Sequence, residues 1–168
     1  MRILNLVAGE KWTGIAAVVF DQTAALVAGG FEAQYGFVGE SPLRERLLPL
    51  GWARPLLARP GSPLDYAREV RRLEDTIRRE KFDIVHAHAT HDHYVAAFAV
   101  RGTPVRLART IHNVRHVRRG PASRALFRST AAFAFANRAI AEKFGTEGPV
   151  HSPVVDAERF RPVGKEKA

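Results

Sequence analysis

Five side chains that can carry chemistry lie close together in the stretch FDIVHAHATHDHYVAAF, residues 82–98. They are His86, His88, His91, Asp92 and His93. Imidazole and carboxylate groups bind zinc, and imidazole also exchanges protons near neutral pH. The cluster therefore has three interpretations: a metal site, a catalytic or binding site, or a strand end with incidental histidines.

The metal interpretation is a zinc-dependent hydrolase built on the histidine cluster 86–93. The cluster is similar at first sight to the His-x-His-x-Asp-His motif of metallo-β-lactamase-type hydrolases. In this chain the pair Asp92-His93 comes two residues later than that motif requires. The chain also opens with a strand, a helix and a strand, whereas that fold begins with a run of strands. Zinc hydrolysis therefore stays an alternative, and no metal ligand is predicted.

The second interpretation follows from strand geometry. If Phe82–His88 is a strand, His86 and His88 point to the same face, because side chains alternate along a strand. His88 would stand at the carboxyl end of this strand, where it could bind a ligand. For His86 a hydrogen-bonded place in the core is favoured, and His91 and His93 are expected at the exposed start of a helix that Thr90 caps.

A second group of polar side chains follows the predicted strand Val105–Ile111. His112 and Asn113 come directly after it and can donate or accept hydrogen bonds. Arg115, in the run HNVRHVRRG, brings a guanidinium fork that suits phosphate or carboxylate. The alternative for this run is a solvated basic loop.

The third group lies in the loop that follows the predicted first strand, Arg2–Val7. This loop ends at Thr13 and Gly14, and the next helix begins there. Gly14 has no Cβ, so a phosphate could approach the backbone and the free N–H groups of the helix start. The alternative is a plain strand-to-helix turn.

Strand and helix patterns alternate along the whole chain, which indicates an α/β fold. We expect a Rossmann-like, doubly wound and mainly parallel sheet of about six to seven strands, with helices on both faces. Ligands in such sheets bind beyond the carboxyl ends of the strands. The predicted strands are 2–7, 31–38, 53–58, 82–88, 105–111, 138–141 and 150–154. The predicted helices are 15–28, a short helix that starts at Ser41-Pro42 and ends before Gly51, a helix from Ser62-Pro63 to about residue 77, and helices at 91–100 and 121–137.

Composition limits the class of protein. The chain has 168 residues, 46% hydrophobic and 26% charged, which is typical of one globular domain. It has no cysteine, so disulfides and thiolate metal sites are excluded. No signal peptide or membrane-spanning segment is expected. The net charge of +9 favours anionic partners, so a basic nucleic-acid-binding module is a further alternative. No nucleic-acid motif is visible, and no nucleic acid is expected.

Five segments in order resemble one known family, the N-terminal half of a GT-B-fold glycosyltransferase of family 4, the "group 1" type. They are RILNLVAGEKWTG, EKFDIVHAH, RLARTIHN, ANRAIAEKFG and VHSPVVDAERFRP. The family typically has x-P-D-V-V-H-A-H at the second segment, T-x-H at the third and I-P-N-G-V-D-x-x-R-F-x-P at the last. This chain departs from the pattern at Phe82, at Asn137 and at Pro153-Val154.

The resemblance implies a function. Residues 1–163 would form the N-terminal Rossmann-like domain of a retaining glycosyltransferase, and 164–168 a solvated tail or the start of a linker to a C-terminal donor domain. The acceptor would be a cell-envelope glycan or lipid-linked molecule. His112, the T-x-H histidine, would be catalytic, and Thr13, Gly14, His88, Asn113 and Arg115 would bind acceptor or phosphate.

The same resemblance implies the partners. The nucleotide-sugar donor would bind mainly to the missing C-terminal domain, and no cofactor is expected. The isolated chain would be inactive. The protein would be cytoplasmic, in contact with the anionic inner face of the membrane.

Overall fold

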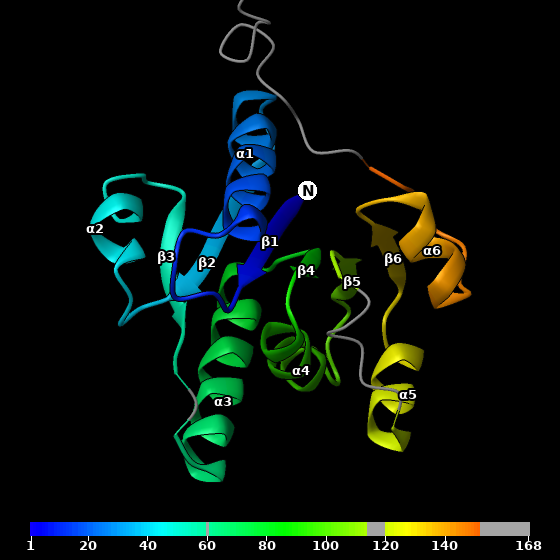
Figure 1. Ribbon diagram of the computed structural model, residues 1–168. Coiled ribbons are helices and arrows are strands. Elements are labelled where there is room, and N and C mark those ends of the chain that lie inside the picture. Colours follow the sequence, from blue (N-terminus) through cyan, green and yellow to red (C-terminus); the bar gives the residue numbers. More distant parts are fainter. Residues whose placement is uncertain (60, 114–119, 152–168) are drawn as a thin grey trace, which may run out of the picture.

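A computed structural model describes residues 1–59, 61–113 and 120–151 of the chain. In this part of the chain six parallel strands form one sheet in the order β3-β2-β1-β4-β5-β6 (Figure 1). The strands are β1 (Arg2–Val7), β2 (Glu32–Val38), β3 (Ala53–Leu57), β4 (Ile84–Ala87), β5 (Arg106–Ile111) and β6 (Ala132–Phe135). The predicted α/β, doubly wound parallel sheet is therefore confirmed.

Helices cover both faces of the sheet. They are α1 (Gly14–Ala28), α2 (Leu43–Leu47), α3 (Pro63–Glu80), α4 (Thr90–Ala99), α5 (Pro121–Arg128) and α6 (Arg138–Phe144). In Figure 1, α1 and α6 lie on one side of the sheet, and α3, α4 and α5 lie on the other. The strand order reverses between β1 and β4, so the loops that follow these two strands diverge and leave room for a ligand.

Local sequence explains where the two longest helices begin. Ser62 accepts a hydrogen bond from the backbone N–H of Asp65, and Pro63 occupies the first turn of α3, as predicted. Thr13 caps α1 by accepting from the backbone N–H of Ala16. The short α2 differs from the prediction, because Pro42 is its N-cap and the Ser41 hydroxyl donates to the carbonyl of Val38 instead.

The prediction for residues 121–141 is wrong in two places. The helix that begins at Pro121 ends at Arg128 and does not continue to Asn137. The hydroxyls of Ser129 and Thr130 donate back to the carbonyl of Leu126 and close its last turn. The sixth strand is β6, and the predicted strand 138–141 lies inside α6, whose first turn is capped by the Asn137 side chain.

The predicted seventh strand is described only at its start. Val150 forms an isolated parallel bridge with Phe135 at the edge of β6. The remainder of 150–154 lies outside the described residues, as do Arg115 and the tail 164–168.

The two faces of the central strands differ in chemistry. Leu4, Val85 and Leu107 point to the side of α3 and α4 and form the main apolar core. On the side of α1, polar residues replace part of this core. Asn5 donates to the hydroxyl of Thr23, which lies on α1. This polar face leads toward the carboxyl ends of β4 and β5.

Candidate functional site

A pocket of about 260 Å³ lies at the carboxyl ends of β1, β4 and β5. This is the edge at which a doubly wound sheet binds its ligands. The polar side chains in its wall are Thr13, His88, Thr90, Arg109, His112 and Asn113. Gly9, Ile15, Ala89 and Ile111 complete the lining.

The pocket gathers four of the six site residues that the sequence predicts, namely Thr13, His88, His112 and Asn113. Gly14 follows Thr13 as the first residue of α1 and is not part of the lining. A Cβ at Gly14 would meet no atom within 4 Å, so the space beside it is open. Arg115 lies outside the described residues.

His88 and His112 are in direct contact. His88 follows β4 and His112 follows the neighbouring strand β5, and their Nδ1 and Nε2 atoms lie 3.2 Å apart. Two imidazole nitrogens can share a hydrogen bond only if one carries a proton and the other does not. Desolvation lowers the pKa of both rings, to about 4 for His112 and well below the usual value for His88, so both are neutral at pH 7.

These two rings belong to a row of four imidazoles. His86 packs against His88 with ring centres 4.1 Å apart, which agrees with the predicted common face. His86 also hydrogen-bonds the hydroxyl of Thr110 at 2.8 Å. At the other end His151 lies edge-on to His112, with ring centres 6.3 Å apart, and its Nδ1 is 3.5 Å from the amide nitrogen of Gln22 on α1.

The remaining histidines of the opening cluster face away from this row. His91 binds Glu69 of α3 at 2.9 Å, and this hydrogen bond raises the pKa of His91. His93 is buried and bonds the hydroxyl of Thr130 at 2.8 Å. The expectation of an exposed position is therefore wrong for His93, because it lies on the face of α4 that packs toward α5.

Asp92 replaces Thr90 as the cap of α4. Its carboxylate accepts hydrogen bonds from the backbone N–H groups of His88, Ala89 and His93 at 2.8–3.0 Å. Burial nevertheless raises the pKa of Asp92 to about 6. The helix begins at Thr90, with Ala89 as the N-cap residue, so the predicted capping by Thr90 is wrong.

This arrangement does not favour the zinc alternative. The five residues of the cluster 86–93 separate into the histidine row, a helix cap and two structural hydrogen bonds. Among the residues that the structure describes, no group of three or more potential ligands is arranged to hold a metal ion. The same residues contain no helix that is long and apolar enough to cross a membrane.

Sequence reasoning missed Arg109, whose side chain is only 4% exposed and forms part of the pocket wall. Desolvation lowers its pKa, while the charge of Asp92 opposes this effect. A signal was present in the strand pattern. Leu107, Arg109 and Ile111 alternate with Ala108 and Thr110, so the period of two puts Arg109 on an apolar face.

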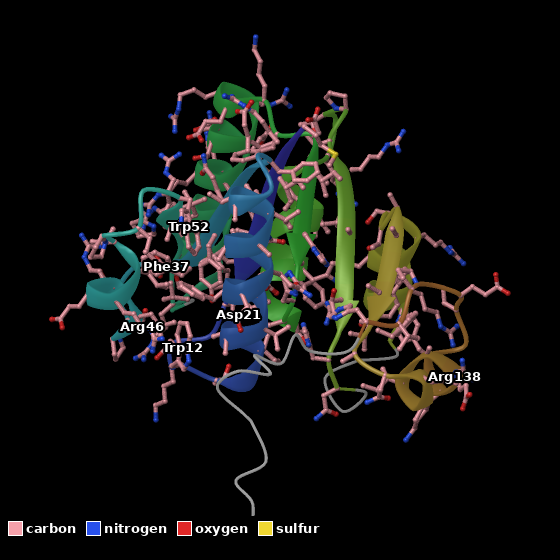
Figure 2. All side chains as sticks on the ribbon, turned by 90° about the horizontal axis from the view of Figure 1, so that it is seen from above. Trp12, Asp21, Phe37, Arg46, Trp52 and Arg138 are labelled. Carbon is pink, nitrogen blue, oxygen red and sulfur yellow. The ribbon has the colours of Figure 1, made fainter. Side chains whose placement is uncertain are left out.

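The loop between β1 and α1 is held from two sides. Glu10 forms an ion pair with Arg59, which follows β3. Trp12 packs against Phe20 of α1, and the Arg46 guanidinium lies 3.6 Å from the centre of the Trp12 ring. Figure 2 shows Trp12 and Arg46 side by side near the start of α1. These contacts fix the loop that carries Gly9 and Thr13 to the pocket.

Comparison with known protein families agrees with the resemblance found in the sequence. The model of Glycosyltransferase Family 4 matches residues 12–143 of the chain. No curated protein sequence matches significantly.

Several solved structures share the fold. Anabaena Alr3699/HepE in complex with UDP-glucose has a TM-score of 0.71 and 16% identity, over 94% of this chain and 45% of that one. MurG of Acinetobacter baumannii has a TM-score of 0.69 and 12% identity, over 90% and 44%. A glycosyltransferase from Rickettsia africae ESF-5 has a TM-score of 0.68 and 15% identity, over 92% and 41%. The chain spans less than half the length of each of these proteins.

Proposed function

The chain belongs to glycosyltransferase family 4, and we propose that it is the acceptor-binding half of a retaining glycosyltransferase. The whole protein would transfer a sugar from a nucleotide-sugar donor to a cell-envelope glycan or lipid-linked acceptor. Residues 1–163 would form its N-terminal domain, and 164–168 the start of a linker to a donor-binding domain. Anabaena HepE, a protein of the same fold, binds UDP-glucose, which supports a nucleotide sugar as donor.

The convergence of His88, His112 and Thr13 on one pocket carries this proposal. These residues come from different segments of the chain, and they meet at the strand ends where this type of sheet binds ligands. A retaining transfer needs a positioned acceptor hydroxyl, and it needs stabilisation of the leaving nucleoside diphosphate and of an oxocarbenium-like centre. Positioning and electrostatics supply most of this.

In this proposal His112 is the catalytic residue. Its Nε2 contacts His88, which leaves Nδ1 for a hydroxyl of the acceptor or of the transferred sugar. The low pKa of His112, about 4, keeps the ring neutral at pH 7, so it acts as a hydrogen-bonding group and adds no charge. His88 holds the ring, and Asn113 adds a second polar group in the pocket wall.

The start of α1 serves the phosphate side of the reaction. Thr13 lies in the pocket wall, and the open space beside Gly14 lets a phosphate approach the first turn of the helix. Free N–H groups and the positive end of the helix dipole favour an anion there. Arg115 belongs to this group by its place in the sequence, directly after the pocket residues His112 and Asn113.

We place the protein in the cytoplasm, and its net charge of +9 supports contact with the anionic inner face of the membrane. Such contact would bring the pocket to a lipid-linked acceptor. In this proposal no cofactor and no nucleic acid takes part.

Transfer assays on the natural polypeptide that carries residues 1–168 test this proposal. UDP-glucose and related nucleotide sugars are supplied with a cell-envelope extract, and labelled product is measured. We expect His112→Ala to lower the rate about 10²- to 10³-fold with an unchanged fold, as for the loss of one aligned hydrogen-bonding group. His91→Gln is the matched control, because His91 binds Glu69 and faces away from the pocket.

The same assay on residues 1–168 alone tests whether the donor site lies outside this chain. We expect UDP-glucose to bind this chain weakly and to give no product. Tight donor binding with turnover by residues 1–168 would contradict the proposal that the donor site lies elsewhere. Full activity of His112→Ala would remove the assigned catalytic residue.

A further inference from the structure

Arg109 is a buried cation in the wall of a ligand-sized pocket. Its side chain is 4% exposed, and its Nε has no hydrogen-bond partner in the described part of the chain. Buried guanidinium groups are ordinarily paired, because burying a charged donor without an acceptor is unfavourable. An unpaired guanidinium donor in the wall of a cavity therefore indicates that a bound ligand supplies the missing acceptor.

The nearest compensating charge does not fill this role. Asp92 attracts Arg109 electrostatically, which opposes the effect of burial on the pKa of Arg109. The carboxylate oxygens of Asp92, however, already accept the backbone N–H groups of His88, Ala89 and His93. Asp92 therefore balances charge and serves as a helix cap, while the donor on Arg109 Nε stays unused.

The shape of a guanidinium group defines the missing partner. Arginine presents Nε and a terminal nitrogen side by side, so two parallel hydrogen bonds can form to the two oxygens of a carboxylate or phosphate. Neutral hydroxyl groups would form weaker hydrogen bonds with these two nitrogens than a carboxylate or phosphate does. The neighbouring His88 and His112 are neutral, and they offer further hydrogen bonds without competing for the anion.

The volume of the pocket narrows the choice of ligand. At about 260 Å³ it lies below the range of about 300–1,000 Å³ that is typical of sites for drug-sized ligands. It suits a group of monosaccharide size and is too small for a whole nucleotide sugar. Because the proposed function places the phosphates of the donor at the start of α1, the anion at Arg109 is expected on the acceptor.

We propose that Arg109 selects an acceptor sugar that carries a carboxylate or phosphate group, by binding this anion from the wall of the pocket formed with Thr13, His88 and His112. This inference rests on the proposed function, in which the pocket holds the acceptor. Arg109 is then a specificity-determining residue. It binds the acceptor through its charged group and takes no part in bond making.

Calorimetric titration of residues 1–168 tests the inference with three probes: glucose 6-phosphate, glucuronate and glucose. We expect one or both charged sugars to bind at least about tenfold more tightly than glucose. The charged sugar that binds more tightly shows whether the natural anionic group is a phosphate or a carboxylate. Arg109→Gln should lower the affinity for that probe about tenfold or more and leave glucose unchanged.

Two further variants act as controls. Arg106→Gln removes an exposed arginine from the first position of the same strand and should bind all probes as the native chain does. Arg109→Lys keeps the charge but loses the planar fork, and it should give an intermediate affinity. If Arg109→Gln fails to fold, as circular dichroism would reveal, Arg109→Lys alone decides. Native affinity of Arg109→Lys for the charged probe would then contradict the inference.

The remaining outcomes separate this inference from the proposed function. Equal affinity of the native chain for charged and neutral sugars, or native affinity in Arg109→Gln, overturns the inference and leaves glycosyl transfer standing. If Arg109→Gln weakens the binding of UDP-glucose but not that of the charged sugars, the anion site belongs to the donor. This result also overturns the inference. Charged-sugar binding that depends on Arg109, without transfer by the natural polypeptide, contradicts the proposed function and leaves the anion site in place.

Discussion

The Nδ1 atom of His88 lies 3.2 Å from the Nε2 atom of His112, although the two residues follow different strands. Their pairing joins the ends of β4 and β5 at the pocket. Desolvation is the main cause of the low pKa of each ring, so both imidazoles are neutral and one of the two facing nitrogens donates its N–H to the other. The orientation of His112 is thus set by a neighbour that is itself buried.

Gly14→Ala should separate function from folding. Its Cβ would meet no atom within 4 Å, and alanine is a better helix former than glycine, so the free energy of unfolding should stay equal or rise by up to about 1 kcal/mol. Glycosyl transfer by the natural polypeptide should fall if a phosphate approaches this backbone. Urea unfolding and the transfer assay give the two readouts. Full activity of Gly14→Ala would assign the loop a purely structural role.

Gly148→Ala should loosen the segment that brings His151 to the histidine row. A Cβ at Gly148 would lie 2.3 Å from the backbone carbonyl oxygen of Phe133, which cannot move without disturbing β6. We expect a loss of stability of about 1–3 kcal/mol and a shift in the imidazole NMR signals of His151. Gly51→Ala is the matched control, because its Cβ would meet nothing within 4 Å. Equal stability of the two variants would contradict the close contact.

Thr130→Val should destabilise the packing between α4 and α5. The Thr130 hydroxyl donates to the carbonyl of Leu126, so it accepts from Nε2–H of His93. Valine has nearly the same shape but no acceptor, which leaves a buried donor without a partner. We expect the free energy of unfolding to fall by about 1–3 kcal/mol in urea denaturation. Thr146→Val, at an exposed position, should change it by less than about 0.5 kcal/mol.

Acidification should destabilise the fold below about pH 6.5. Burial lowers the pKa of His86 and His112 to about 4 and that of His93 to about 3, and it lowers the pKa of His88 as well. Between pH 6.5 and about 4 the unfolded chain therefore binds more protons than the folded one, so stability rises with pH in this window. Each fully buried histidine contributes up to about 1.4 kcal/mol per pH unit.

Two groups act in the opposite direction. The pKa of Asp92 is raised to about 6, so protonation of Asp92 favours the folded state below that pH. The pKa of His91 is also raised, so protonation of His91 near pH 6.5 likewise favours the folded state. The four histidines outweigh them. Urea unfolding at pH 7 and pH 5 measures the balance, and His93→Phe should reduce the pH dependence. Stability that does not change between these two pH values would contradict the expectation that the four buried histidines outweigh Asp92 and His91.

The sequence was sufficient to predict most of the fold because its elements are locally consistent. The short apolar run Arg2–Val7 and the capped amphipathic pattern from Ser62 leave few alternatives, and alternating strands and helices imply a parallel sheet. The segment 121–144 was harder to interpret. Its alanines favour a helix, yet the alternation in Ala-Phe-Ala-Phe, residues 132–135, indicates a strand, and Asn137 is a good helix cap.

The site was predicted only where residues directly follow a strand. His88, His112 and Asn113 are found in this way, because the carboxyl ends of parallel strands meet at one edge. Arg109 and Glu69 were not found, since their importance comes from burial between elements that are distant in sequence. Asp92 was assigned to a possible metal site, whereas the backbone N–H groups that occupy its oxygens can be identified only in the folded chain.

The bridge between Phe135 and Val150, with the neighbouring contact of His151 to Gln22, has a kinetic consequence. It anchors the chain at residue 151 beside His112, which is one of the pocket residues, so the polypeptide that follows starts from a fixed point near the pocket. A group carried a short way along that polypeptide would experience a high effective concentration at the pocket. Encounters between the two would then be intramolecular and independent of dilution.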